Sequence, residues 1–372
     1  MLSVTEIRSL SELDSLADDW SRLWVESAEP TVAQTLDWYR AYCRTSPSFI
    51  EPRIIVAKAA GDVLGILPLV LKRGSFRDGS PRILGLPDEP GLGLCGVVGK
   101  NRSATLGSAM TYLRHRRADW DVIEITERTL DGLSGNRVHT AMRFAGWRPA
   151  TQAVGSLGRF EIVARWPDFL AETDATTRLS LYRSQHNVGH DNRYEFVRHR
   201  SGPTCPGSAD DIETLLEEAF HISGGPRVSQ TRRDFLKEIT QSLSADGRAD
   251  ICLLYRDSLP VASMINAVVG DRVVSIYGAV TDHDRTTVAS KLVQELLVDG
   301  GRRGDRDVTW SESDDHPLDG WALERLPLSQ RVCFAKYSTK AQFLRIGRAA
   351  SQLWHRNETP TRPAPELRVV GT

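Results

Sequence analysis

The chain has 372 residues, enough for two domains of ordinary size, each with its own hydrophobic core. Hydrophobic residues make up 40% of it and charged residues 26%, a composition typical of globular proteins. Its 47 basic and 48 acidic residues give a formal net charge of −1, which excludes the broad positive field of many nucleic-acid-binding proteins, so no nucleic-acid partner is expected.

The N-terminal residues, the apolar runs and the cysteines indicate the cellular compartment. The first twenty residues carry acidic side chains and lack the apolar core of a signal peptide. No run approaches the roughly 20 apolar residues that a membrane span needs. We therefore expect a cytoplasmic protein with no membrane partner. The scattered cysteines form no CxxC pair, which fits a reducing compartment: Cys43, Cys95, Cys205, Cys252 and Cys333.

In the first half, apolar spacing predicts two helices, a β-hairpin, a further helix and a strand. The first helix is indicated by the helical spacing of Leu13, Leu16, Trp20 and Leu23. The hairpin turns at residues 60–62, where Ala-Gly-Asp separates two aliphatic runs. The other predicted elements are a helix at 33–42, hairpin strands within 52–74, a helix at 104–116 and a strand at 119–127.

The second half repeats this order. Two runs rich in β-branched and aliphatic residues predict buried strands at 251–255 and 273–277. After them, apolar residues at helical spacing predict a helix, and we expect Gly300–Gly301 to end it. The turns lie at Asp257–Ser258 and Gly270–Asp271, the helix carries Val288, Leu292, Leu296 and Leu297, and a last strand covers 307–311.

The repeated order predicts an α/β protein, with a mixed α+β sheet built from two similar units. The boundary is expected near residues 160–168, which gives domains at 1–165 and 166–356. Residues 357–372 contain three prolines and no periodicity, so we expect a disordered tail there.

Five stretches of the second half match a known pattern in order and spacing: Pro260–Val261–Ala262, Tyr277–Gly278, the loop Asp282 to Ala289, Gly300–Gly301 and the strand Asp307 to Ser311. In these the chain resembles the CelD-like acetyltransferases of the GNAT superfamily, proteins often linked to bacterial polysaccharide synthesis. The resemblance implies tandem GNAT-like (acyl-CoA N-acyltransferase) domains. The duplicated arrangement also resembles the FemABX peptidyltransferases.

The start of the long helix is the candidate cofactor site. The first N–H groups of a helix lack internal partners, and the helix dipole makes that end positive, so it suits a pyrophosphate. The resemblance implies acetyl-CoA or another acyl-CoA as co-substrate. Its pyrophosphate is expected at Arg285, Thr286, Thr287, Val288, Ala289, Ser290 and Lys291.

GNAT chemistry needs a base for the attacking ammonium and a proton donor for the leaving thiolate. We expect Glu312 to be the base, because it lies at the end of the strand after the cofactor helix, with Asp314 as second choice. Tyr277 or Tyr337 would donate the proton. The alternative is that the acids are solvated loop residues and the tyrosines pack in the core.

A metal site is not expected. His186 and His190 stand four residues apart, as zinc ligands on a helix do, but Asn187 takes the place of the glutamate that a zinc protease needs. Gly189 also weakens a helix there.

Three functions remain open. The leading hypothesis is an acyl-CoA-dependent N-acyltransferase (acetyltransferase) that acts on an amino sugar or other small amine. The second is a FemABX-like aminoacyltransferase that uses aminoacyl-tRNA. The third is a catalytically inactive GNAT-like binding or scaffold protein, which the lack of glycine in residues 285–290 supports.

Overall fold

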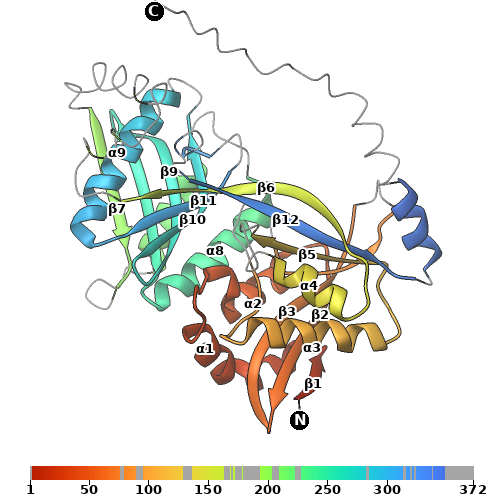
Figure 1. Cartoon of the computed structure of the whole chain (residues 1–372). Coiled ribbons are helices and arrows are strands. Elements are labelled where there is room, and N and C mark those ends of the chain that lie inside the picture. The colour runs from red at the N-terminus through yellow and green to blue at the C-terminus, as the bar shows by residue number, and fades with distance from the viewer. Residues whose placement is uncertain are drawn as a thin grey trace, which may run out of the picture.

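The computed structural model (Figure 1) describes residues 2–75, 79–88, 95–128, 136–162, 193–202, 209–222, 228–281, 285–312, 316–318, 324–336 and 338–347, with positions 168, 171, 178 and 321. The predicted tail at 357–372 and the histidine pair at 186 and 190 lie outside these residues.

The first half follows the predicted order of helices, hairpin, helix and strand. The hairpin turns at Ala60 and Gly61, both with positive φ, as the Ala-Gly-Asp signal indicates. Its elements are β1 (Leu2–Ile7), η1 (Leu10–Leu16), α1 (Ala17–Val25), η2 (Val32–Gln34), α2 (Leu36–Thr45), β2 (Phe49–Ala59), β3 (Asp62–Arg73), β4 (Arg82–Gly85), α3 (Arg102–His115), β5 (Val122–Arg128), α4 (Arg137–Phe144) and β6 (Ala150–Glu161).

The second half repeats the arrangement of strands. Its elements are β7 (Tyr194–Arg200), α7 (Ala209–Phe220), α8 (Gln230–Ala245), β8 (Ala249–Arg256), β9 (Leu259–Val269), β10 (Arg272–Val280), α9 (Arg285–Arg303), β11 (Asp307–Ser311) and β12 (Glu324–Phe334). Residues 339–347 are also helical.

The described strands form one twelve-stranded sheet with a palindromic order: β1-β2-β3-β4-β5-β12-β6-β11-β10-β9-β8-β7. In each half, four successive strands of the sheet pair antiparallel and the last of them pairs in parallel with a fifth, β4 with β5 and β10 with β11. A helix, α3 or α9, connects the members of each parallel pair, as a parallel connection requires. The predicted mixed sheet and its duplicated unit are therefore confirmed.

The two halves exchange their last strands. β6 pairs with β11 of the second half, and β12 pairs with β5 of the first, while β6 and β12 pair with each other at the centre. Figure 1 shows β6 and β12 as two long strands that run between the halves. The domain limits at 1–165 and 166–356 stay a prediction, but hydrogen bonding does not stop at residue 165.

A shared hydrophobic core on one face of the sheet holds the halves together. Trp38 on α2 meets Phe235 on α8 edge-on, with ring centroids 4.9 Å apart, and both side chains are buried. Arg44 and Glu238 form an ion pair of 2.7 Å between the same two helices. A separate cluster lies on the other face, between α9 and the inner residues of β10 and β11.

Helix α9 corrects two expectations. It does not end at Gly300–Gly301 but continues to Arg303. Gly300 is required for packing and not as a helix end, because a Cβ there would lie 2.7 Å from the Ile162 side chain. Gly304, with φ of 77°, ends the helix, which is the usual place for a left-handed glycine. The segment expected as a loop from Asp282 to Ala289 is already helical from Arg285.

Candidate active site

The strands β10 and β11 diverge at the centre of the second half. They pair from Arg272 with Asp307 to Val274 with Thr309, and beyond that point the described residues of β11 pair only with β6. A β-bulge follows at once in β10, between Ser275 and Tyr277. A bulge re-aims the backbone and often marks a functional site. The edge of β10 that faces this gap can offer backbone N–H groups to a ligand carbonyl.

Ser275 and His316 bridge the gap. The Oγ of Ser275 lies 3.1 Å from Nε2 of His316, and the Leu318 N–H donates to Nδ1 at 3.2 Å. Since Nδ1 accepts a hydrogen bond, the neutral ring carries its proton on Nε2 and donates to Ser275. The Ser275 hydroxyl in turn donates to the Tyr277 carbonyl at 3.2 Å. This chain of bonds fixes the bulge, and it excludes His316 as a base toward Ser275.

His316 is enclosed on every side that the structure describes. Its side chain stacks on Trp310, with ring planes 12° apart, and the residue is 7% exposed. Burial, reinforced by the charges of Arg232 and Arg285, lowers its pKa to about 3. A Cβ on Gly278 would lie 2.6 Å from the Pro317 ring, so glycine permits the close approach. His316 is therefore neutral throughout the physiological pH range.

Tyr277, a predicted proton donor, lies on β10 just beyond the bulge and is 4% exposed. Its ring packs edge-on against Phe220, with centroids 5.7 Å apart. The hydroxyl is buried and has no hydrogen-bond partner among the described residues. Burial raises the pKa of Tyr277 to about 12. Tyr277 thus keeps its proton and has an unused donor.

Glu312, the predicted base, lies just after β11 at the same edge of the sheet. Its Oε2 accepts a hydrogen bond from Ser156 on β6, and its Oε1 pairs with Arg325 on β12 at 2.8 Å. Each oxygen thus accepts one hydrogen bond and keeps a second lone pair. Asp314 and Tyr337 lie outside the described residues.

The predicted cofactor residues 285–291 form the first two turns of α9. Thr287, Val288, Ala289 and Ser290 are buried, so their side chains do not occupy the exposed surface at the helix start. Arg285 reaches across and donates to the His316 carbonyl at 3.4 Å. Thr286 is exposed, and Lys291 pairs with Glu295 at 2.6 Å. Because α9 connects β10 to the parallel β11, its N-terminus lies at the same sheet edge as Tyr277 and Glu312.

A cavity of about 900 Å³ lies between the halves, on the face of the sheet away from α9. Val308 and Trp310 of β11 pack in the cluster under α9, so the alternating Thr309 and Ser311 point to the other face, where they line the cavity. Ser275 lines it too. The diverging strands therefore have a helix N-terminus on one side and a cavity on the other.

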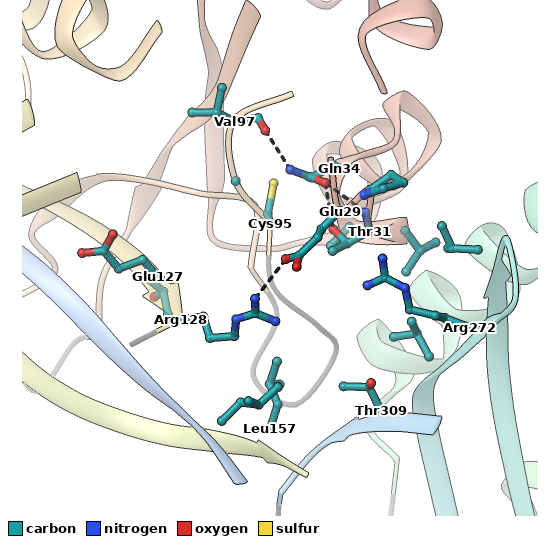
Figure 2. A pocket seen from close by; sticks show the side chains of 18 of the residues that line it. Glu29, Thr31, Gln34, Cys95, Val97, Glu127, Arg128, Leu157, Arg272 and Thr309 are labelled. Atoms are coloured by element: carbon teal, nitrogen blue, oxygen red, sulfur yellow. Dashed lines mark hydrogen bonds and ion pairs between the residues drawn. The ribbon is translucent and has the colours of Figure 1, made fainter. Parts of the chain in front are cut away.

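Residues of both halves surround this cavity (Figure 2). Arg128 from β5 and Arg272 from β10 reach into it from opposite walls, and Glu29 lies between them. Glu29 pairs with Arg128 at 2.9 Å. The side-chain amide of Gln34 donates to the Val97 carbonyl at 2.8 Å, which ties the η2 segment to the loop after β4.

The sequence reasoning assigned no role to Ser275, His316 or the arginines of the cavity. None of them belongs to a local pattern, because each meets its neighbours only when segments distant in the sequence come together. His316 lies two residues after Asp314, the second choice of base, and precedes a proline, but nothing in that spacing indicates contact with β10.

The described part of the chain holds no group of three or more His, Cys, Asp or Glu side chains placed to bind a metal ion. None of its described helices is both long and apolar enough to cross a membrane.

Comparison with known proteins adds a family signature in the second half. Residues 175–316 match the family model described as an acetyltransferase (GNAT) domain. None of the curated proteins matches the chain.

Solved structures resemble the whole chain at low identity. The crystal structure of FemX superposes with a TM-score of 0.57 at 10% identity, over 94% of this chain and 99% of FemX. A tandem GNAT protein from the clavulanic acid biosynthesis pathway gives 0.51 at 14% identity, over 91% and 100%. A conserved protein of unknown function from Bacteroides thetaiotaomicron gives 0.51 at 9% identity, over 90% and 100%.

At such identities the neighbours show the fold alone, and that fold is the tandem GNAT fold. The predicted fold class is confirmed. The second half carries a GNAT acetyltransferase domain, and together these findings support an acyltransferase, an enzyme of the transferase class. The GNAT fold typically binds acyl-CoA.

Proposed function

We propose that the chain is an acyl-CoA-dependent N-acyltransferase that acylates the amine of a small molecule such as an amino sugar. The observation that carries the proposal is the divergence of β10 and β11 beside the N-terminus of α9, within the segment that matches the GNAT domain. The CelD-like resemblance, a role in polysaccharide synthesis and a cytoplasmic location belong to the same proposal.

In this proposal the acyl-CoA pyrophosphate lies at the start of α9. Thr286 is exposed there and Arg285 is half-buried, and the helix has no acid in its first turn that would repel an anion. The backbone N–H groups of the first turn of α9, which lack helical partners, would be the donors, with Arg285 adding charge. Glycine is not needed, because the side chains of 287–290 are turned inward.

The thioester would enter the gap between the strands, and the amine would approach from the cavity. Backbone N–H groups at the Ser275–Tyr277 bulge would polarise the carbonyl as the amine nitrogen attacks it. The C–N bond forms, the C–S bond breaks, and the thiolate takes a proton from Tyr277 or Tyr337, which regains one from the nitrogen of the new amide. Glu312 or Asp314 would accept the proton that the ammonium loses.

Calorimetric titration with acetyl-CoA tests the proposal directly. We expect binding with a dissociation constant in the micromolar range, and release of free CoA thiol when an amino sugar such as glucosamine is added. Absence of acetyl-CoA binding at millimolar concentration would disprove it. CoA binding without any acyl transfer to a panel of amines would instead favour a catalytically inactive protein.

A FemABX-like aminoacyltransferase is the second candidate, since the FemX structure superposes over nearly the whole chain. That likeness concerns the fold only. The net charge of −1 argues against a tRNA substrate. Retention of the protein on immobilised aminoacyl-tRNA at moderate salt, together with failure to bind acetyl-CoA, would favour this candidate over the first.

A further inference from the structure

The cavity between the halves has more positive than negative charge in its walls. Four acidic residues line it, Glu29, Glu127, Asp307 and Glu324. Six arginines line it, more than these acids can neutralise: Arg102, Arg128, Arg137, Arg159, Arg272 and Arg306.

Each of these acids already has an arginine partner. Glu29 pairs with Arg128 at 2.9 Å, and Asp307 pairs with both Arg159 and Arg306 at 3.1 Å. Glu324 also pairs with Arg159, and Glu127 is taken by an arginine of β12 that does not line the cavity.

Three arginines of the cavity have no such partner. Among the described residues, no carboxylate lies within ion-pair distance of Arg102, Arg137 or Arg272. All three are half-buried, so water solvates them only in part. The cavity therefore holds guanidinium charge that its own walls do not neutralise.

Arg102 shows this most clearly. It lies at the start of α3, and its guanidinium donates to the Glu29 carbonyl oxygen at 3.2 Å. Its Nε is buried and has no hydrogen-bond partner among the described residues. Burial lowers the pKa of Arg102; the charge of Glu29 opposes the shift, and the charges of Arg137 and Arg128 reinforce it. The guanidiniums of Arg128 and Arg137 are thus close enough to that of Arg102 to repel it.

The chemistry of this arginine group, Arg102, Arg128 and Arg137, selects its ligand. A guanidinium presents a planar fork of N–H donors that matches the oxygens of a phosphate or carboxylate. The walls carry a formal excess of two positive charges, which a carboxylate would halve and a phosphate monoester, at roughly −1.5 to −2, would neutralise. The volume of about 900 Å³ accommodates a ligand of the size of a sugar phosphate.

We infer that the interdomain cavity binds a phosphorylated small molecule, with the phosphate held by Arg102, Arg128 and Arg137 and the remainder extending toward Ser275 and Thr309. Arg272, on the opposite wall, contributes charge to the same ligand. This inference rests on the proposed function only in taking the phosphorylated molecule to be the amine acceptor. The hydroxyl-bearing wall at the strand gap would then receive its amine end.

The test compares two probes that differ by one phosphate, glucosamine 6-phosphate and glucosamine, by calorimetry on the full chain. We expect glucosamine 6-phosphate to bind at least about tenfold more tightly, as charge-assisted hydrogen bonds predict. Its affinity should fall as ionic strength rises. R102Q and R137Q should each weaken its binding about tenfold or more and leave acetyl-CoA binding unchanged.

R302Q is the matched control, because Arg302 is an exposed arginine in the last turn of α9, away from the cavity lining. It should bind glucosamine 6-phosphate as the wild type does. Thermal unfolding of each variant separates loss of the site from loss of the fold. If R102Q does not fold, R137Q alone tests the phosphate site.

The outcomes separate the inference from the proposed function. Equal affinity for the two probes, binding of neither at millimolar concentration, or wild-type affinity in both variants would overturn the inference. Phosphate-dependent binding without acetyl-CoA binding would support the inference and disprove the acyltransferase. Binding of acetyl-CoA, together with equal affinity for glucosamine 6-phosphate and glucosamine, would overturn the inference and support the acyltransferase.

Discussion

Ser275 and His316 show how single side chains set the backbone of the candidate active site. The histidine ring donates from Nε2 to the serine, and the serine donates to the Tyr277 carbonyl, so both residues hold the bulge in β10. The ring can do this only while it is neutral, because protonation of Nδ1 would lose the bond from the Leu318 N–H. The geometry of the gap is thus linked to the protonation of one buried histidine.

H316Q should flatten the dependence of stability on pH. The pKa of His316 is about 3 in the folded chain and about 6.5 when unfolded, so only the unfolded state binds this proton between those values. The stabilising contribution of neutral His316 is therefore fully present above pH 6.5. As pH falls below that value, the free energy of unfolding decreases by about 1.4 kcal/mol per pH unit. Urea unfolding at pH 7.5, 6.0 and 5.0 measures the slope. H115Q, which removes an exposed histidine, should keep the wild-type slope; the same slope in H316Q would contradict the prediction.

Y277F should separate catalysis from stability. The hydroxyl of Tyr277 is buried without a partner among the described residues, so its removal should leave the free energy of unfolding unchanged or raise it by up to about 1 kcal/mol. If Tyr277 protonates the thiolate, kcat should fall about tenfold to a hundredfold with KM nearly unchanged. Steady-state kinetics and urea unfolding measure both quantities.

Tyr255 provides the contrast, because its hydroxyl donates to the Glu218 carboxylate. Y255F should therefore lose about 1 kcal/mol of stability and keep its activity. A wild-type kcat in Y277F would remove Tyr277 from the mechanism and leave the donor role to Tyr337.

At the scale of elements, α9 joins the proposed pyrophosphate site to the strand gap. Its first turn carries Arg285, which contacts the segment after β11, and its last turn carries Arg302 and Arg303. The positive end of the helix dipole and the charge of Arg285 lie at the same sheet edge. An anion at this end would interact with both.

R285Q should weaken acetyl-CoA binding about fivefold to tenfold, the effect of one charge-assisted contact of roughly 1 kcal/mol or more. R302Q, at the other end of the same helix, should bind acetyl-CoA as the wild type does. Calorimetry on both variants measures this. Equal affinities in R285Q and the wild type would place the pyrophosphate away from the start of α9.

Local patterns in the sequence were sufficient for most elements and insufficient for the site. Apolar runs and helical spacing predicted the hairpin β2–β3, the strands β8 and β10, and helix α9, because each pattern reflects burial within one segment. The end of α9 was wrong because Gly300 has a packing role that involves Ile162, more than a hundred residues away. Ser275, His316 and the arginine group depend on contacts between distant segments, which no local spacing records.

At the scale of the whole molecule, the exchange of β6 and β12 makes each half depend on the other. Strand β5 pairs antiparallel with β12 from Val122 to Arg128, and β11 pairs antiparallel with β6. The cavity also takes its walls from both halves. A change in how the halves meet would therefore alter the cavity and the strand gap together.

Fragments cut at the predicted boundary should not fold separately. A piece of residues 1–165 would lack β12 and expose the edge of β5, and a piece of 166–356 would lack β6 and expose the edge of β11. Each would also expose its side of the contact between α2 and α8, including Trp38 or Phe235. We expect each fragment alone to be aggregated or largely unfolded by circular dichroism and gel filtration. Co-expression should restore a soluble one-to-one complex with a cooperative unfolding transition, because the central β6–β12 pairing can form between two chains. A cooperative transition and a monomeric elution volume for either fragment by itself would show that the halves are independent domains joined by strands that neither needs.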